Sequence, residues 1–346
     1  MIKIFNREQY NWVKKGEKKI LFTSKDYSES KFYPQTAIHI SKIIPRFSHY
    51  NRFKKTIILI IIQNNFKTVV FNYDYKILTL YYLLSLSFLW PRNFKNIIFI
   101  TLLIDINRLL NPWQSGNVSQ SIKNMIIKYI IIIPNHIIVH TKKEEYELEK
   151  LVRYGRSQKI HFIKFPALDV NINKYKSDFN KGIKYILCAG NYRDINTFTK
   201  AIEKTTVHGV IISGGTISSI NKSAKIEYFV NVDLQFYRSA IKNATAVVLP
   251  FKKSSPLRSL GQITACDCIS MGVPLIVAKS FHLIDYFNDN DVIYYEPENS
   301  IDLQKKINYV LKTGASINER NIRLKNNIMD SLSLDNFVKT LVNISC

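Results

Sequence analysis

Short apolar runs alternate with polar or amphipathic stretches along the first half of the chain. The predicted strands there occupy 18–24, 68–74, 97–105, 135–141 and 159–167. The stretches 36–47 and 142–155 are predicted helices, the second ending at Gly155. Buried β-branched runs separated by helices are typical of a parallel sheet with helices on both faces. The first half therefore predicts one doubly wound α/β domain.

The same alternation restarts after a polar segment, 169–182, which lacks periodicity and is the predicted linker. Beyond it the predicted strands are 184–190, 208–215, 225–231, 245–251 and 274–279, with helices at 194–204, 234–244 and 264–271. A final helix over 326–346 carries an apolar face that consists of Leu332, Leu334, Phe337, Leu341 and Val342.

This pattern predicts two Rossmann-like doubly wound domains in tandem. Their expected bounds are 1–168 and 183–325, and the helix 326–346 is expected to pack back toward the N-terminal domain. Ligands of such sheets bind outside the carboxyl ends of the strands. We therefore expect the site in a cleft between the two domains.

The net charge of the chain indicates which classes of partner it favours. Its 346 residues carry a formal net charge of +23, which favours phosphates, nucleic acid or an anionic membrane surface. The four cysteines are irregularly spaced and fit buried thiols in a reducing cytosol better than a disulfide framework. The polar start of the sequence does not resemble a signal peptide.

Three apolar runs raise the question of membrane insertion. They lie at 57–62, 78–90 and 129–139, and each is shorter than the ~18–20 apolar residues that a transmembrane helix needs. We interpret them as buried strands and core helices. The sequence thus predicts a cytoplasmic protein that contacts the inner face of the plasma membrane through its positive charge.

The segment 245–279 carries the most informative chemistry. A buried strand ends at Pro250, and the loop after it contains Lys252, Arg258 and Ser259. Gly261 then opens a helix that starts with Gln262, Ile263 and Thr264. A helix N-terminus preceded by a glycine presents free N–H groups and a positive dipole end, which suit a diphosphate. The same spacing also fits an ordinary loop between a strand and a helix.

Further polar positions follow neighbouring strands. Asp267, one turn into the helix, is placed to accept hydrogen bonds from ribose hydroxyls. Gly190, Asn191 and Arg193 follow the strand 184–190, where glycine lets the backbone approach a phosphate and arginine supplies charge. Ser213 and Gly214, after the strand 208–215, are weaker candidates for a nucleotide pocket, and they also fit a plain turn.

These motifs resemble the donor-site signature of retaining GT-B glycosyltransferases, in particular the family 4 type of bacterial surface-polysaccharide synthesis. The matching letters are LPF at 249–251, SLGQIT at 259–264, Asp267, and SMGVPLI at 270–276, together with ILCAGNYRDINTFTKAI at 186–202. The pair FY at 236–237 also matches, and the resemblance implies that Tyr237 lies near the base. The resemblance implies that the loop amides from Gly261 to Thr264 bind the nucleotide diphosphate, that Asp267 binds the ribose and that Arg193 assists the leaving diphosphate.

The resemblance also implies transfer from a nucleotide-diphosphate sugar to a glycan or lipid-linked acceptor with retention of configuration. Such a transfer would serve exopolysaccharide, lipopolysaccharide or capsule synthesis. No cofactor and no metal are expected, because positive protein groups take the place of a cation. On the acceptor side, Asp105 and His140 are candidate catalytic residues at strand ends.

Two departures from the family pattern keep an alternative open. Asp267 replaces the usual Glu, and Ser259 stands where many members carry the first Glu of an E-x7-E pair. A catalytically degenerate GT-B scaffold or partner subunit would fit these changes. A basic nucleic-acid-binding protein is a second alternative, although the scattered basic residues form no recognised motif and no specific nucleic acid is expected.

Overall fold

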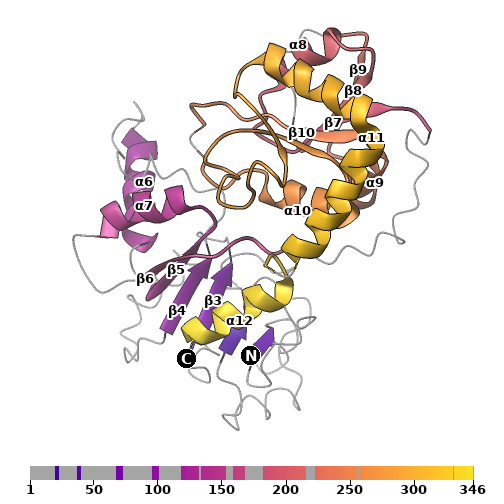
Figure 1. Ribbon diagram of the computed structural model, residues 1–346. Coiled ribbons are helices and arrows are strands. Elements are labelled where there is room, and N and C mark those ends of the chain that lie inside the picture. The colour runs from indigo at the N-terminus through magenta and orange to yellow at the C-terminus, as the bar shows by residue number, and fades with distance from the viewer. Residues whose placement is uncertain are drawn as a thin grey trace, which may run out of the picture. The chain divides into compact units, whose positions relative to one another are not determined.

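The structure is a computed structural model and describes residues 20–22, 37–39, 68–72, 96–100, 118–131, 134–152, 159–167, 182–215, 223–255, 257–329 and 331–345. The chain divides into two compact units (Figure 1). Unit 1 comprises Met1–Ile163 together with Asp335–Cys346, and unit 2 comprises Lys164–Leu334. Most of the predicted linker 169–182 lies outside the described residues.

Unit 1 contains a six-stranded parallel sheet in the order β2-β1-β3-β4-β5-β6. Its strands are β1 (Ile20–Phe22), β2 (Ala37–His39), β3 (Thr68–Asn72), β4 (Asn96–Ile100), β5 (His136–Val139) and β6 (Lys159–Phe162). Its described helices are α6 (Val118–Ile131), α7 (Lys142–Val152) and α12 (Leu334–Ser345), the last belonging to this unit from Asp335.

One prediction for unit 1 is wrong. The stretch 36–47 was expected to be a helix, but Ala37–His39 form β2. This strand lies parallel to β1, with Leu21 opposite Ile38. Backbone hydrogen bonds along the edge of β1 therefore outweigh a local helical pattern, as expected where tertiary pairing competes with propensity. Gly155 lies outside the described residues.

Unit 2 contains a second six-stranded parallel sheet, in the order β12-β11-β10-β7-β8-β9. Its strands are β7 (Tyr185–Ala189), β8 (His208–Ser213), β9 (Ile226–Val230), β10 (Ala246–Leu249), β11 (Leu275–Ala278) and β12 (Ile293–Tyr295). Its helices are α8 (Ile195–Glu203), α9 (Leu234–Asn243), α10 (Gln262–Met271) and α11 (Ser300–Met329). The prediction of two parallel α/β units is confirmed.

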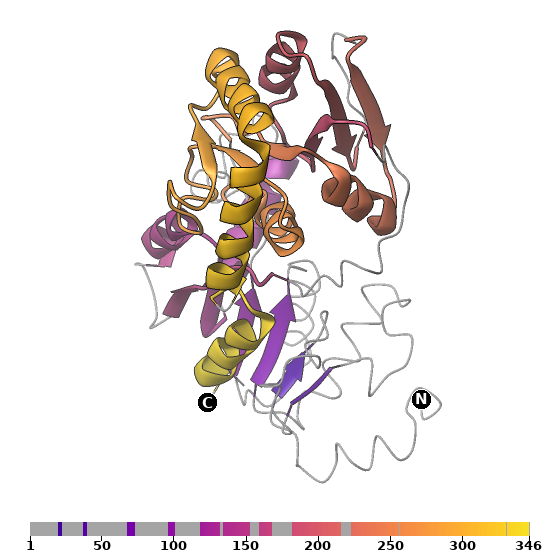
Figure 2. The ribbon, with the colours of Figure 1, turned by 45° about the vertical axis from the view of Figure 1, so that its right-hand side comes forward.

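The middle of the second sheet is fully buried. Every residue of β7, β10 and β11 is buried, which explains why these strands read as uninterrupted apolar runs. The long helix α11 packs beside α8 in both views (Figures 1 and 2), and Gln304 Nε2 donates to Lys204 O at 2.8 Å. Among the described residues, no helix is long and apolar enough to span a membrane.

Candidate functional site

The order of strands in unit 2 indicates where a ligand binds. From β7 the chain adds β8 and β9 on one side, and it then returns to add β10, β11 and β12 on the other. The switch point therefore lies between β7 and β10, and open α/β sheets bind ligands at the carboxyl ends of such strands. The loops after these two strands are directly bonded, because Asp194 N donates to Pro250 O at 2.9 Å.

The loop after β7 is organised around Arg193. Its Nε donates to Ala189 O and its Nη1 to Asn191 O, both at 2.9 Å. Gly190 has φ +104°, and a Cβ there would lie 2.6 Å from Arg193 Nη2. Glycine therefore leaves the space that the guanidinium occupies, and the other N–H groups of Arg193 have no acceptor among the described residues. Burial lowers the pKa of Arg193, which remains cationic at neutral pH.

Asn191 joins this loop to the end of β8. Its Oδ1 accepts from Gly214 N at 2.7 Å and from Ser213 Oγ at 3.3 Å. On the other side of the loop, Asp194 caps α8, since its carboxylate accepts from Thr197 N and from Thr197 Oγ1. The loop is thus fixed at both ends, and Asn191, Ser213 and Gly214 belong to one polar cluster.

Phe251, directly after β10, connects the two loops. Its ring is completely buried, and the Arg193 guanidinium carbon lies 5.0 Å from the ring centroid. A Cβ on Gly261 would lie only 2.6 Å from Phe251 Cζ, so Gly261 also packs directly against this ring. The basic side chain of one loop and the helix start of the other loop therefore contact the same aromatic ring.

The N-terminus of α10 is open to an anion. Gly261 precedes the helix in a left-handed conformation with φ 86°, and no side chain caps it. Ala265 N makes the first intrahelical bond, to Gly261 O at 2.8 Å. The N–H groups of Gln262, Ile263 and Thr264 consequently have no acceptor within the helix, and the helix dipole adds positive potential at this point.

A buried histidine supports the start of α10. Gln262 Nε2 donates to His282 O at 3.0 Å, and the His282 ring stacks on Phe251 with centroids 4.4 Å apart. His282 Nε2 donates to Leu257 O at 2.9 Å, so Nδ1 is the acceptor for Ser280 Oγ at 2.8 Å. Both nitrogens of the neutral ring are used, and burial lowers the pKa of His282 to about 3.

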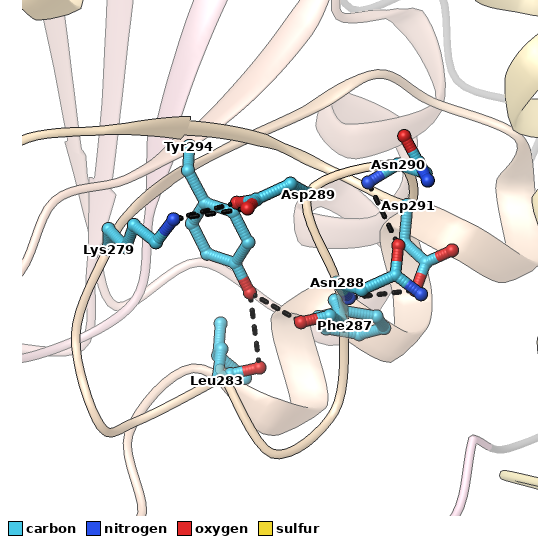
Figure 3. A network of polar contacts seen from close by, with 8 residues as sticks. All are labelled: Lys279, Leu283, Phe287, Asn288, Asp289, Asn290, Asp291 and Tyr294. Atoms are coloured by element: carbon cyan, nitrogen blue, oxygen red, sulfur yellow. Dashed lines mark hydrogen bonds and ion pairs between the residues drawn. The ribbon is translucent and has the colours of Figure 1, made fainter.

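The loop that carries His282 is braced by the polar network in Figure 3. Tyr294 Oη donates to Phe287 O at 2.9 Å, and Lys279 Nζ pairs with Asp289 at 2.9 Å. Asn288 N donates to Asp291 Oδ2 at 2.8 Å and closes the next turn. These contacts hold the segment after β11 in one shape and thereby fix the position of His282 against the helix start.

The pKa of His282 predicts a pH dependence of folding. In the unfolded chain this imidazole protonates below about pH 6.5, whereas in the folded protein it stays neutral down to about pH 3. The unfolded state therefore binds the additional proton within this window, and the free energy of unfolding falls as the pH falls. His282 contributes at most about 1.4 kcal/mol per pH unit to the slope of the free energy of unfolding against pH.

Urea denaturation between pH 4 and 7 measures this slope. We expect His282→Gln to reduce this slope by the equivalent of about one bound proton. Equal slopes for the wild type and His282→Gln would show that His282 titrates normally.

Two side-chain pairs link α9 to α10. The hydroxyls of Tyr237 and Thr264 lie 2.7 Å apart. One turn further, Arg238 Nε lies 3.5 Å from Asp267 Oδ2, and both side chains are buried. Burial raises the pKa of Asp267, and Arg238 opposes this shift. Asp267 is thus 2% exposed and paired within the unit, and its role with ribose stays a prediction.

The remaining candidates differ in their surroundings. Lys252 and Ile263 are exposed, the latter at the free end of α10. Arg258 is buried, donates to Ser255 O at 2.5 Å and lies 4.8 Å from the Phe281 ring centroid. Ser259 Oγ is buried, with no hydrogen-bond partner among the described residues.

The two acceptor-side candidates belong to unit 1. His140 is fully buried after β5, where its N donates to Glu144 Oε2 at 3.0 Å and its Nδ1 contacts Ile163 O at 2.8 Å. These contacts join the start of α7 to the segment after β6. Asp105 lies outside the described residues. A catalytic role for either residue stays a prediction.

Sequence reasoning missed the residues that hold the site together. Phe251 contacts both the Arg193 side chain and Gly261, and His282 contacts Phe251 and Gln262. Phe251 belongs to the Leu-Pro-Phe stretch that opens the matching segment, but it was given no role there, and His282 lies in no recognisable motif. In the sequence, Phe251 looks like the last apolar residue of a strand, and His282 looks like an ordinary polar residue of a loop. Tyr192, between Asn191 and Arg193, was missed as well.

Comparisons with known proteins agree with this architecture. No protein-family model and no curated protein matches the sequence. Among solved structures, HepE from Anabaena, in complex with UDP and glucose, has a TM-score of 0.64 at 10% identity and covers 94% of this chain and 99% of its own. Sucrose-phosphate synthase from Thermosynechococcus elongatus has a TM-score of 0.62 at 12% identity, covering 90% of this chain and 80% of its own.

A third structure is similar. An α,α-trehalose-phosphate synthase (UDP-forming) from Burkholderia xenovorans, in complex with glucose-6-phosphate, has a TM-score of 0.63 at 8% identity and covers 84% of this chain and 76% of its own. At such identities the likeness establishes the fold. The chain has the GT-B fold, as predicted, and the activity has to be argued from the site itself.

Proposed function

We propose that this protein is a glycosyltransferase that uses a nucleotide-diphosphate sugar. The observation that carries the proposal is the convergence of Arg193 and the open N-terminus of α10 on the Phe251 ring, at the switch point of unit 2. A cation and free N–H groups that flank one ring are groups that a diphosphate binds, which supports the proposal. The HepE structure, a complex with UDP and glucose, adds support from a protein of the same fold.

The chemistry follows from the charge of the leaving group. In the transfer, the bond between the anomeric carbon and the diphosphate oxygen breaks, the acceptor hydroxyl oxygen forms the new bond, and its proton passes to the departing diphosphate. Negative charge then collects on the departing diphosphate. Arg193 and the amides of Gln262 to Thr264 are pre-positioned to stabilise this charge without reorganisation.

The finer parts of the proposal are retention of configuration, independence of metal and a glycan or lipid-linked acceptor in cell-surface polysaccharide synthesis. Arg193 and the helix dipole supply positive charge that a metal would otherwise provide. If activity of a dialysed, metal-free preparation depended on added Mg²⁺, metal independence would be wrong. NMR of the product distinguishes retention from inversion.

An anionic membrane surface is the proposed location of the acceptor. The net charge of +23 supports it, as does the exposed Tyr146 ring on α7, which has Lys150 Nζ at 4.0 Å and Lys143 Nζ at 5.7 Å from its centroid. Co-sedimentation with phosphatidylglycerol vesicles, but not with phosphatidylcholine vesicles, is expected. Equal sedimentation with both would contradict this part.

A thermal-shift screen tests the proposed activity. The wild-type protein is heated with UDP, GDP, ADP and their common sugar conjugates, and binding to the folded state raises the midpoint by mass action. A shift with one nucleotide family, followed by transfer of the sugar to an acceptor extract, supports the proposal. Binding without transfer would indicate a partner subunit, and well-folded protein that binds no nucleotide would exclude a glycosyltransferase.

A further inference from the structure

Tyr192 has a strained backbone conformation and an exposed side chain. It adopts the left-handed conformation with φ 58°, which is unfavourable for a residue with a large side chain. Its side chain nevertheless lies in solvent, 67% exposed, at the tip of the loop after β7. Strain of this kind persists only where the surrounding structure enforces it, and it is concentrated at functional sites.

The backbone on both sides of Tyr192 is fixed by the contacts of its neighbours. Asn191 O accepts from Arg193 Nη1 at 2.9 Å, and Asn191 Oδ1 accepts from Gly214 N. Asp194 N donates to Pro250 O at 2.9 Å. These bonds force the residue between them outward. Within the described part of the chain, the Tyr192 side chain makes no hydrogen bond or ring contact that would compensate for this conformation.

We propose that Tyr192 is a specificity-determining residue whose ring stacks on the apolar face of the donor's sugar. This inference rests on the proposed function, which places Arg193 against the leaving diphosphate. The transferred sugar and the nucleoside are both attached to that diphosphate, and we assign the exposed ring next to Arg193 to the sugar. An exposed planar ring on a fixed backbone offers contact area to a pyranose, and contact orders only the two torsions of its side chain.

Isothermal titration with UDP and UDP-glucose tests the proposal on the wild type and two variants, and the same comparison uses GDP and GDP-mannose if the screen selects guanine. Tyr192→Asn removes the ring but tolerates φ > 0. We expect it to weaken UDP-glucose binding by roughly 3- to 10-fold and to leave UDP binding unchanged. Tyr192→Phe keeps the ring and should bind both ligands as the wild type does.

Stability provides an independent readout. Because Asn relieves the strain, the Tm of Tyr192→Asn should equal or exceed that of the wild type, by up to about 2–4 °C. A structural role would instead lower the Tm, and that result would overturn the proposal. Equal weakening of UDP and UDP-glucose, or no weakening of either, would overturn it too. If the wild type bound no nucleotide at all, the proposed function itself would fail, which is a different result.

Discussion

Replacing Arg193 by alanine is expected to lower kcat of sugar transfer by about 10²- to 10³-fold and to lower the Tm, because two backbone carbonyls lose their donor. The guanidinium is held by Ala189 O and Asn191 O and has further N–H groups for the leaving diphosphate. Its charge matters most when the bond to the diphosphate breaks, because negative charge develops at that moment. The loss should therefore appear mainly in kcat and less in the Kd of the bound nucleotide.

Two variants make this result specific. Arg193→Lys keeps the charge but cannot bond both carbonyls in the same way, so it should recover only part of the rate. Lys200→Ala removes an exposed positive charge from α8 and should leave kcat unchanged. Steady-state kinetics over a range of donor concentrations measures the effect. A normal kcat in Arg193→Ala would show that Arg193 does not contribute to catalysis.

Replacing Gly261 by alanine is expected to damage both stability and binding. The residue has φ 86°, and the new methyl group would lie 2.6 Å from Phe251 Cζ. Backbone strain of about 1–2 kcal/mol and overpacking of about 1–3 kcal/mol should together lower the free energy of unfolding by roughly 2–5 kcal/mol. Any shift of the loop also moves the N–H groups of α10, so nucleotide binding should be lost.

Gly272 at the other end of α10 provides a matched control. It has φ 70°, but a Cβ there would meet nothing within 4 Å. Gly272→Ala should therefore lower the free energy of unfolding by only about 1–2 kcal/mol and leave nucleotide binding intact. Urea denaturation and titration with UDP compare the two variants. Equal losses in both would mean that the contact with Phe251 is unimportant.

The sequence was sufficient to predict both parallel sheets, because buried strands such as β10 and β11 are uniformly apolar and end at recognisable loops. It was not sufficient for elements whose form depends on partners. The strand β2 is three residues long and is defined by its pairing with β1. Most of the helix α11 went unrecognised, since Gly314 and many polar residues interrupt its apolar pattern. The single helix predicted over 326–346 is wrong, because α11 ends at Met329 and α12 begins only at Leu334.

The candidate site divides in the same way. Arg193 and Gly261 could be predicted because glycine and arginine at strand ends have direct chemical consequences. The contacts that fix them come from residues distant in sequence, such as Phe251 and His282, which no spacing rule connects. Asp267 illustrates the limit most clearly: its position indicated a ribose ligand, yet its neighbour Arg238 is 29 residues away and pairs with it in a buried contact.

The most direct test of the central claim is an NMR titration of deuterated, ¹⁵N-labelled protein with UDP, or with GDP if the screen selects guanine. If the diphosphate binds at the head of α10, the amide resonances of Gln262, Ile263 and Thr264 should shift downfield on addition of the nucleotide, because new charge-assisted hydrogen bonds form there. The same titration of Gly261→Ala should show no such shift. Saturable binding that leaves these three amides unchanged would contradict the account and place the nucleotide elsewhere.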